Sequence, residues 1–299
     1  MTTGILVMAY GTARGPDDIE RYYTDIRGGR SPSPQLLKEL TERYAAIGNR
    51  FPLTEITEAQ AAGLGRELDL PAYVGMKHSP PFIPETVAKM AADGIDRILG
   101  IVMAPHYSRM SIGGYVDRAR SAEAEVHLDV IESWHTHPAF LDVLTERVGR
   151  ARDRLTTSER ERDLVVFTAH SLPARIVDEG DPYPDQLRET ADAVAGRLGL
   201  ERYATGWQSA GRTPEPWLGP PLEDLIVEVA GDHTAVVVVP CGFVADHLEI
   251  LYDLDIEARE VAERAGLAFA RTESLNADPD FIRALASIVR DRLASWEAS

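Results

Sequence analysis

The stretch LVVFTAHSLP at residues 164–173 is an apolar run that ends in a histidine and a proline. Four consecutive apolar residues, Leu164–Phe167, are typical of a strand buried on both faces of a parallel sheet. His170 follows this strand, and Pro173 prevents it from continuing. Ligands bind at the carboxyl ends of strands in open α/β sheets, so we expect His170 at a binding edge rather than among the histidines of the core.

A second stretch, AVVVVPCGFVADHLEILYD at residues 235–253, repeats this pattern with a carboxylate. Its apolar run ends at Pro240, and Glu249 opens the predicted helix that follows. Two strands therefore deliver one imidazole and one carboxylate to the same edge. Such a pair can take protons from a substrate and hold a divalent metal.

Apolar runs and helical patterns alternate along all 299 residues. We expect buried parallel strands at Ile5–Ala9, Ile98–Met103, Leu164–Thr168 and Ala235–Val239, with shorter ones at Ala72–Met76 and Arg202–Gly206. Helical periodicity falls at Pro34–Ile47, Ile83–Asp93, Ala139–Leu155, Pro184–Leu198, Pro221–Val229 and Asp280–Ser295. Strands that alternate with helices predict an α/β fold with right-handed crossovers.

The order of these features repeats in the two halves of the chain. Each half runs strand, helix, strand, proline-rich loop, helix, and a strand that ends at a proline. The repeat predicts two similar Rossmann-like domains whose parallel sheets face a central cleft. We expect one domain at residues 1–115, a second at 116–274, and a C-terminal helix at 275–299 that returns to the first.

Composition excludes several classes of protein. A net charge of −17 and a pI near 4.9 disfavour nucleic-acid binding, because the chain would repel a phosphate backbone. The only cysteine, Cys241, cannot form an internal disulfide, and it fits a reducing compartment. The N-terminus lacks the basic residues of a signal peptide, and no apolar run reaches about 18 residues. We therefore expect a cytoplasmic protein without a membrane span.

Glu249, Asp253 and Glu257 recur at every fourth position of the predicted helix and share one face. Like charges at that spacing repel one another, and a solvated acidic face is common in so acidic a chain. The alternative is a row of oxygen ligands that leads inward and suits Fe²⁺ or Mg²⁺. The spacing leaves both interpretations open.

A tyrosine and several cations are further candidates. Tyr10 follows the first predicted strand, where it is either an ordinary loop residue or a phenol that contacts a bound metal centre. Three cations, Arg27 among them, lie in a stretch without acids at 26–38, and Arg43 stands beside Tyr44 on the next predicted helix. Such residues usually serve solubility, whereas arginine forks also suit the binding of carboxylates.

Tyr115 and His78 complete the candidates at the edge. Tyr115 belongs to the glycine-rich segment SIGGYVDR, which we expect to be a mobile loop over the cleft, and His78 takes the place that Gln208-Ser209 has in the second half. The chain has no Gly-x-Gly-x-x-Gly after a strand, no Walker A loop and no Gly-x-Ser-x-Gly elbow. Five other histidines are expected in structural or surface positions: His106, His127, His135, His137 and His233.

Eight longer motifs run through the chain: LVMAYGT (6–12), DIERYYTDIRGGR (18–30), KHSPPFI (77–83), APHYS (104–108), AHSLP (169–173), DPYPDQL (181–187), GWQSAGRTPEPWLGP (206–220) and GFVADHLEILYD (242–253). Over essentially the whole chain they resemble the ferrochelatase family, most closely its soluble coproporphyrin III ferrochelatases of Gram-positive bacteria. The resemblance implies the chelatase fold. It also implies insertion of Fe²⁺ into coproporphyrin III, giving iron coproporphyrin III (coproheme) and two protons in haem biosynthesis.

The resemblance also implies roles for the candidate residues. His170 and Glu249 match the pair that handles the metal and the protons, and Tyr10 matches the tyrosine on the opposite face of the porphyrin. The acidic row extends this metal site through Asp253 and Glu257, where a divalent metal could regulate the enzyme. Porphyrin propionates are expected on residues from the first half, namely Arg27, Arg43, Tyr44 and Tyr115, with His78 nearby.

Two features depart from the family pattern. Many relatives carry Ser-Pro-Leu with a hydroxyl on a propionate, and this chain has Phe51-Pro52-Leu53 instead. Some relatives bind a [2Fe–2S] cluster through cysteines, which a chain with only Cys241 cannot build. We expect a monomer with transient contacts to other enzymes of haem biosynthesis. The alternatives are protoporphyrin IX as the substrate, cobalt or nickel as the metal with another tetrapyrrole, and a non-catalytic haem or porphyrin carrier.

Overall fold

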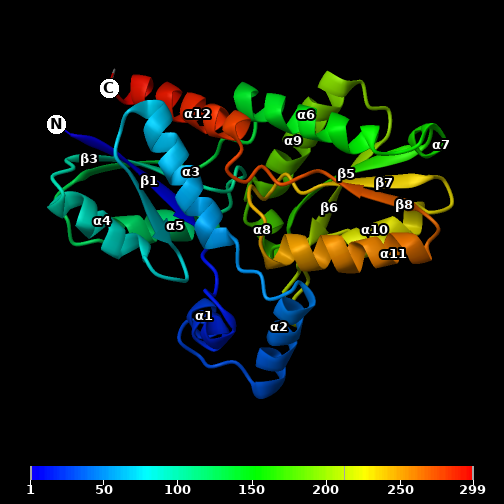
Figure 1. The fold of residues 1–299 in the computed structure, drawn as a ribbon, viewed down its shortest axis with the longest axis horizontal. Coiled ribbons are helices and arrows are strands. Elements are labelled where there is room, and N and C mark those ends of the chain that lie inside the picture. The colour runs from blue at the N-terminus through cyan, green and yellow to red at the C-terminus, as the bar shows by residue number, and fades with distance from the viewer. Residues whose placement is uncertain (1, 212, 298–299) are drawn as a thin grey trace.

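The apolar runs form two parallel four-stranded sheets, which lie side by side in the computed structural model (Figure 1). The structure describes residues 2–211 and 213–297. The first sheet has the order β2-β1-β3-β4, with β1 (Thr3–Ala9), β2 (Ala72–Met76), β3 (Arg97–Val102) and β4 (His127–Ile131). The second has the order β6-β5-β7-β8, with β5 (Asp163–His170), β6 (Tyr203–Gln208), β7 (Ala235–Val239) and β8 (Ala268–Arg271). The predicted α/β architecture with two parallel sheets is confirmed.

Helices cover both faces of each sheet. One face of the first sheet packs on α4 (Ile83–Ala92) and α5 (Ile112–Arg120), and one face of the second packs on α10 (Leu222–Val229) and α11 (Arg259–Arg264). The opposite faces share one continuous core with α3 (Leu53–Leu68), α6 (Pro138–Asp153), α9 (Tyr183–Leu198) and α12 (Pro279–Glu297). Shorter segments are η1 (Pro16–Asp18), α7 (Thr157–Arg160) and α8 (Arg175–Asp178).

The side chains of β1 alternate between these two layers, as the pleat of a strand requires. Leu6 and Met8 pack with α4 and α5, whereas Ile5 and Val7 belong to the continuous core. All four are fully buried. Because both faces are covered, the strand is an uninterrupted apolar run in the sequence.

Strand β5 extends past its neighbour β7 at the carboxyl end. The pairing of β5 with β7 ends at Phe167 and Val239, whereas its pairing with β6 continues to His170 and Gln208. Pro240 follows β7 and turns the chain away. One side of the last residues of β5 therefore has no strand beside it, and His170 lies at that place.

The last helix, α12, packs on elements from both halves of the chain. It packs on α3 and α6, and its Phe281 ring is 6.2 Å from the ring of Trp134 (Figure 1). The approach to α3 is close, because a Cβ at Gly63 would lie 3.1 Å from the side chain of Ile282. The return of this helix to the first domain stays a prediction, which its packing on α3 favours. Residue 1, residue 212 and residues 298–299 of the predicted domain ranges lie outside the described residues.

The place where the chain leaves the first half differs from the expected boundary after residue 115. That position falls inside α5, and the next strand, β4, pairs with β3 of the first sheet. We therefore propose that the first domain continues through Ile131. Strand β4 escaped the sequence analysis because, at the edge of the sheet, it carries His127 and Asp129 instead of an apolar run.

Two helices lie apart from the sheets, below them in Figure 1: α1 (Ile19–Ile26) and α2 (Pro34–Ala46). They share a small apolar cluster that includes Tyr22 and Tyr44, and Leu248 from the second half packs against it. The first-half helices and the loop before Glu249 are therefore in contact.

The acidic row lies on η2 (Glu249–Ala258), a segment with wide π-helical turns that continues into α11. At its end the Arg259 N–H donates to the carbonyl oxygen of Leu254, five residues back. Single π-helical turns inside helices are rare and frequently occur at functional sites. The predicted helix exists, with a geometry that spacing alone did not reveal.

Candidate active site

His170 and Glu249, predicted at one edge of a sheet, lie next to each other. His170 Nε2 is 3.6 Å from Glu249 Oε1, and the two side chains are 35% and 33% exposed, so a ligand can reach both. His170 Nδ1 is hydrogen bonded to the carbonyl oxygen of Ser171. A carbonyl only accepts, so in the neutral ring Nδ1 carries the proton and Nε2 is free to accept another.

A second imidazole, which the sequence analysis did not single out, completes the group. His247 Nε2 is 3.5 Å from Glu249 Oε2, and its Nδ1 is 2.9 Å from the carbonyl oxygen of Ala245. Glu249 therefore stands between two histidines, one on each carboxylate oxygen. The signal was present in the motif DHLE, which places a histidine two residues before the glutamate.

Charge decides the protonation of this group. Burial alone would raise the pKa of Glu249, but the two imidazoles outweigh it and hold that pKa well below its usual range. Burial alone would lower the pKa of His170 and of His247, but the Glu249 carboxylate outweighs it and raises both. At neutral pH the site therefore contains an ionised carboxylate between two imidazoles that bind protons more readily than usual.

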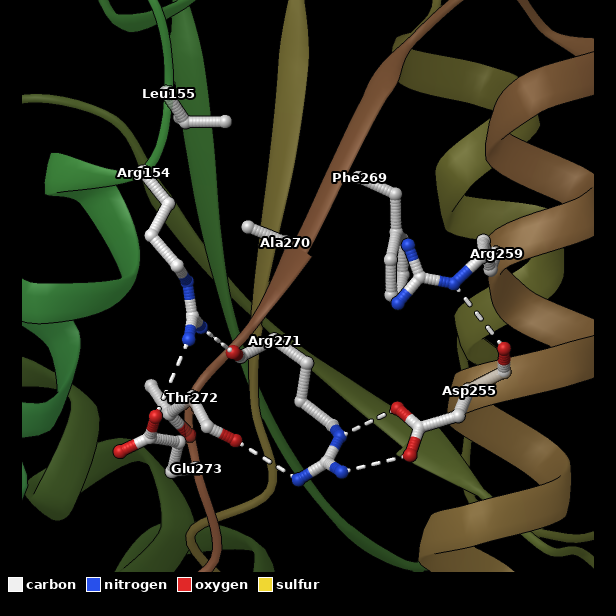
Figure 2. Close-up of a pocket in the computed structure, with 9 residues that line it drawn as sticks. All are labelled: Arg154, Leu155, Asp255, Arg259, Phe269, Ala270, Arg271, Thr272 and Glu273. Carbon is white, nitrogen blue, oxygen red and sulfur yellow. Dashed lines mark hydrogen bonds and ion pairs between the residues drawn. The ribbon is translucent and has the colours of Figure 1, made fainter.

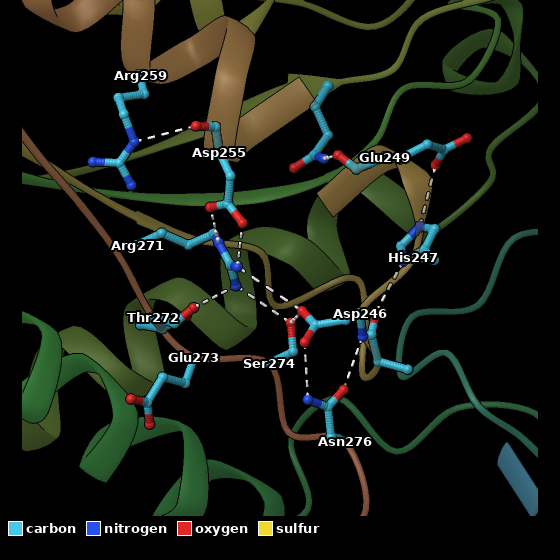
Figure 3. A network of polar contacts seen from close by, with 12 residues as sticks. Asp246, His247, Glu249, Asp255, Arg259, Arg271, Thr272, Glu273, Ser274 and Asn276 are labelled. Atoms are coloured by element: carbon cyan, nitrogen blue, oxygen red, sulfur yellow. Dashed lines mark hydrogen bonds and ion pairs between the residues drawn. The ribbon is translucent and has the colours of Figure 1, made fainter. Parts of the chain in front are cut away.

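Hydrogen bonds of Asp246 hold the loop that carries His247 and Glu249 (Figure 3). The Asp246 N–H donates to Asn276 Oδ1 (2.8 Å), while the carboxylate accepts from Asn276 Nδ2 (3.0 Å) and from Ser274 Oγ (2.6 Å). These bonds join the loop to the segment that follows β8. They fix the backbone that carries the side chains of His247 and Glu249.

The central member of the acidic row is buried, whereas Glu249 and Glu257 are partly exposed. Asp253 is 2% exposed, accepts a hydrogen bond from Ser209 Oγ, and has Arg43 Nη2 at 3.0 Å from its Oδ1. The same Nη2 donates to Glu257 Oε2 at 3.1 Å. Burial raises the pKa of Asp253 to about 7, with Arg43 opposing and Glu249 adding to the shift. A fully solvated acidic face does not describe this row.

Arg43 therefore meets carboxylates of the protein itself. Only Nη2 is used in these two ion pairs, and a guanidinium has further N–H groups that can reach a ligand. Its guanidinium carbon also lies 4.5 Å from the centre of the Tyr252 ring. Within residues 2–211 and 213–297, no three His, Cys, Asp or Glu side chains form a group that could hold a metal ion.

The first half contributes aromatic and basic groups. Tyr10 is 40% exposed, and its ring is 4.6 Å from that of His78. His78 is buried and bonded through Nδ1 to Asp25 Oδ1 at 2.7 Å. Partial burial raises the pKa of Tyr10, and the Glu249 carboxylate adds to this shift. The sequence analysis named Tyr10 and His78 but missed Asp25.

The segment around Tyr115 differs from its prediction. We expected a mobile glycine-rich loop, and the residues instead form helix α5, with Tyr115 4% exposed. Lys77 Nζ lies 4.8 Å from the centre of the Tyr115 ring. A Cβ at Gly114 would come within 2.9 Å of Lys77 Nζ, so the glycine makes room for the lysine inside a helix. Burial lowers the pKa of Lys77 to about 8, and Arg118 adds to the shift.

Tyr44 and Arg27 lie on the helices below the sheets. Tyr44 stacks on Phe51, with ring centres 4.4 Å apart, and its hydroxyl is 3.2 Å from Thr12 Oγ1. Phe51 thus makes an aromatic contact where the family pattern has a serine. The Arg27 guanidinium lies over the Tyr23 ring, and its Nε is buried without a hydrogen-bond partner.

A hollow of about 370 Å³ lies elsewhere, along β8, between Arg154 and Arg259 (Figure 2). Arg271, which lines this hollow, already forms an ion pair, because the Asp255 carboxylate accepts two hydrogen bonds from its guanidinium at 2.8 and 2.7 Å. None of the predicted site residues lines this hollow. This hollow is therefore separate from the edge with His170 and Glu249.

Comparison with known proteins decides the family. The family model for ferrochelatase matches residues 2–293. The chain belongs to the ferrochelatase family. It is a metal-chelatase enzyme, and the resemblance inferred from the eight motifs is confirmed.

Curated members of the family are similar over nearly the full chain. The coproporphyrin III ferrochelatase of Geobacillus sp. (strain WCH70) is 47% identical, covering 97% of each chain. Those of Bacillus subtilis (strain 168) and Listeria innocua are 46% and 43% identical, and the matches cover 97% and 96% of this chain and 97% of each relative.

Solved structures share the fold of this ferrochelatase at much lower identity. SirB from Bacillus subtilis with Fe³⁺ superposes with a TM-score of 0.63 at 12% identity, covering 100% of this chain and 98% of SirB. A sirohydrochlorin chelatase SirB in complex with cobalt gives a TM-score of 0.59. These likenesses establish the chelatase fold alone. Among the described helices, none is both long and apolar enough to cross a membrane.

Proposed function

We propose that this chain inserts Fe²⁺ into coproporphyrin III and releases iron coproporphyrin III and two protons in haem biosynthesis. The observation that carries the proposal is Glu249 between His170 and His247, at 3.6 and 3.5 Å. Insertion needs an anionic ligand for the incoming cation and an acceptor for each proton. One carboxylate and two imidazoles supply these three groups.

Iron is the substrate of the reaction, and Glu249 is its proposed first ligand. The carboxylate is ionised at neutral pH because its pKa is lowered by the two imidazoles. A carboxylate and an imidazole are both suited to Fe²⁺. A pair of ligands, rather than a closed set of four, fits a metal that must leave the protein for the porphyrin.

Proton removal falls to His170 and His247. Fe²⁺ replaces the two pyrrole protons, so two acceptors balance the reaction. His170 Nε2 is free to accept because Nδ1 is bonded to Ser171 O. The raised pKa of both rings strengthens them as bases near neutral pH. Asp253 and Glu257 then lie along the way from the site toward solvent.

We place the porphyrin between this group and Tyr10, whose ring is 40% exposed. Tyr44 and Tyr115 are buried, so their contact with the substrate stays a prediction, and we propose that Arg27 and Arg43 bind carboxylate groups of the substrate. Coproporphyrin III carries four propionates and protoporphyrin IX two, so several cations favour the former. The names of the relatives support the same substrate.

Other assignments remain predictions. A regulatory divalent metal at Asp253 and Glu257 would compete with Arg43, which now lies 3.0 and 3.1 Å from these carboxylates. Five further assignments also remain predictions. They are the role of His78 as a substrate contact, the lack of an iron–sulfur cluster, the cytoplasmic location, the monomeric state, and the transient contacts with other enzymes of haem biosynthesis.

The test is anaerobic steady-state iron insertion, followed by the Soret band, with coproporphyrin III and protoporphyrin IX side by side. Repeated turnover with coproporphyrin III and little with protoporphyrin IX is the expected result. Tight binding of both porphyrins without turnover would support a carrier instead. Equal turnover of both would remove the argument from the cations.

A further inference from the structure

The backbone of His170 is held by a side chain from outside its sheet. In β5, the carbonyl groups of Thr168 and His170 point to the side where β7 has already turned away. The Gly242 N–H donates to the first of them at 3.0 Å, and the Tyr183 hydroxyl donates to the second at 3.0 Å. Tyr183 thus replaces the ladder bond that a longer β7 would have made.

Tyr183 is well placed to hold that carbonyl in one position. Its side chain is 7% exposed, and its ring is 5.4 Å from the ring of Trp207 and 6.2 Å from that of His106. Burial raises the pKa of the phenol, so the hydroxyl keeps its proton and donates a hydrogen bond near neutral pH. The ring cannot turn away without disturbing both neighbours.

Asp181 connects Tyr183 to the first half of the molecule. Its Oδ1 accepts from the Tyr183 N–H at 3.0 Å, at the start of α9. Its Oδ2 accepts from Ser108 Oγ at 3.0 Å and from the Arg109 N–H at 2.8 Å. One carboxylate therefore bonds the residue that holds His170 and a loop that comes from the first sheet.

That loop leads directly into the helix that carries Tyr115. Residues 107–109 follow β3 and precede α5. The Tyr107 N–H donates to Gln186 Oε1 at 2.6 Å, which adds a second bond between the loop and α9. The start of helix α5, which carries Tyr115, and the backbone of His170 are thus tied to the same three residues near the start of α9: Asp181, Tyr183 and Gln186.

We propose that Tyr183 is a positioning residue for His170, and that Asp181 couples this positioning to the first-half loop at 107–109. Tyr183 does not touch the reacting atoms, because it acts through the backbone carbonyl of His170. The inference rests on the proposed function for its activity assay only. Its second measurement, on the backbone itself, does not depend on that function.

The first test is Tyr183→Phe, which keeps the ring and removes the donor. The turnover number for iron insertion should fall by between about tenfold and about a hundredfold, because a misplaced base loses alignment with its proton. The dissociation constant for coproporphyrin III without metal should stay within about twofold, since Tyr183 makes no uniform binding contact. Amide exchange of residues 168–172 should become faster.

Tyr203→Phe is the matched control, because that hydroxyl donates to Asp192 Oδ1 at 3.0 Å on an exposed part of the same sheet. It should leave turnover and exchange at the wild-type level. An unchanged turnover number in Tyr183→Phe, or a loss explained wholly by weaker porphyrin binding or by a lower melting temperature, overturns the positioning role.

The coupling has its own test in Ser108→Ala, which removes one of the two bonds from the loop to Asp181. The variant should lower turnover by a smaller factor than Tyr183→Phe. Combined with Tyr183→Phe it should cost nothing further, because the loop acts on His170 only through Tyr183. Multiplied losses in the double variant overturn the coupling. Inactive wild-type protein would reject the proposed function, and the exchange comparison would still decide the positioning.

Discussion

The carboxyl ends of the two sheets have the same architecture and different chemistry. After β1 and β2 come Tyr10, Lys77 and His78, which are aromatic or basic, and none of the three is a carboxylate. At the end of β5 stands His170, and after β7 comes Glu249, the first of the acidic residues of η2. One fold pattern thus presents aromatic and basic groups on one side and a carboxylate row beside imidazoles on the other.

The difference teaches that the fold supplies the meeting place and the loops supply the reaction. A parallel sheet brings any residues after its strands to one edge. The first edge is stiffened by packing, as between Lys77 and Tyr115, and the second by polar bonds, as between Asp246 and Asn276. Substitutions at the two edges should therefore impair different properties, namely porphyrin binding at the first edge and turnover at the second.

The largest expected effect comes from Glu249→Gln, which keeps the shape and removes the charge. The turnover number should fall by about 10² to 10⁴, while coproporphyrin III still binds, because the metal ligand and the partner of both imidazoles are lost. Anaerobic turnover and porphyrin fluorescence quenching measure the two quantities. Glu228→Gln, on the exposed side of α10, is the control. A variant that retains most of its turnover would contradict the assignment.

For Arg27→Ala at the first edge, we expect weaker porphyrin binding instead of lower turnover. Porphyrin affinity should drop by about tenfold to a hundredfold, the range of a hydrogen bond to a charged group, with little change in turnover at saturation. Lys38→Ala, which removes an exposed cation nearby, controls for charge alone. If both variants bind equally well, Arg27 does not hold a propionate.

Acid should change the free energy of unfolding in opposite directions through two kinds of histidine. Protonation of a histidine away from the carboxylates should destabilise the fold, whereas protonation of His170 should stabilise it. Burial lowers the pKa of His106 to about 3, and the neighbouring His135 adds to this shift. Since the pKa in the unfolded chain is about 6.5, acid protonates the unfolded chain first. The stability from neutral His106 is complete above about pH 6.5 and is lost as the pH falls toward 3.

His106→Gln should therefore lose less unfolding free energy between about pH 7 and about pH 5 than the wild type does. Urea unfolding at the two values measures this difference, and His127→Gln, at an exposed position, is the control. An equal loss in His106→Gln and wild type would mean that His106 does not contribute to the acid sensitivity.

The smallest effect is expected for Phe51→Leu, which keeps an apolar side chain and removes the ring that stacks on Tyr44. Aromatic pairs contribute about 0.5–1.5 kcal/mol beyond their buried area, so coproporphyrin III should bind a few-fold more weakly, by about threefold. Titration of the metal-free complex measures it. Tighter binding would show that Phe51 obstructs the porphyrin instead of shaping its wall.

The sequence predicted those parts of the fold and site that lie close together in the chain. The central strands were visible because both their faces are buried, whereas the edge strands β4 and β8 are short and carry charged residues. The segment at Tyr115 looked like a loop because of its glycines, whereas the helix is stabilised by its packing on the first sheet and by the contact of Tyr115 with Lys77. Propensity gave way there to a contact that no local pattern contains.

The site shows the same division. His170 and Glu249 were found from their positions after strands, but His247 was passed over although it stands two residues from Glu249. The partners of the network, such as Asp25 for His78 and Tyr183 for His170, come from other segments and become visible only when the chain is folded. Their residue types are too common to indicate such a role.

The returning helix α12 has a consequence for how the protein is made. The strands of the first sheet are complete at Ile131, yet α3 and part of one face of that sheet also pack on residues 279–297. During translation the first half must wait for the last helix with part of its apolar surface bare. Chains whose translation stops before the last helix would lack this cover, and chaperones or proteases would bind them before they could bind iron.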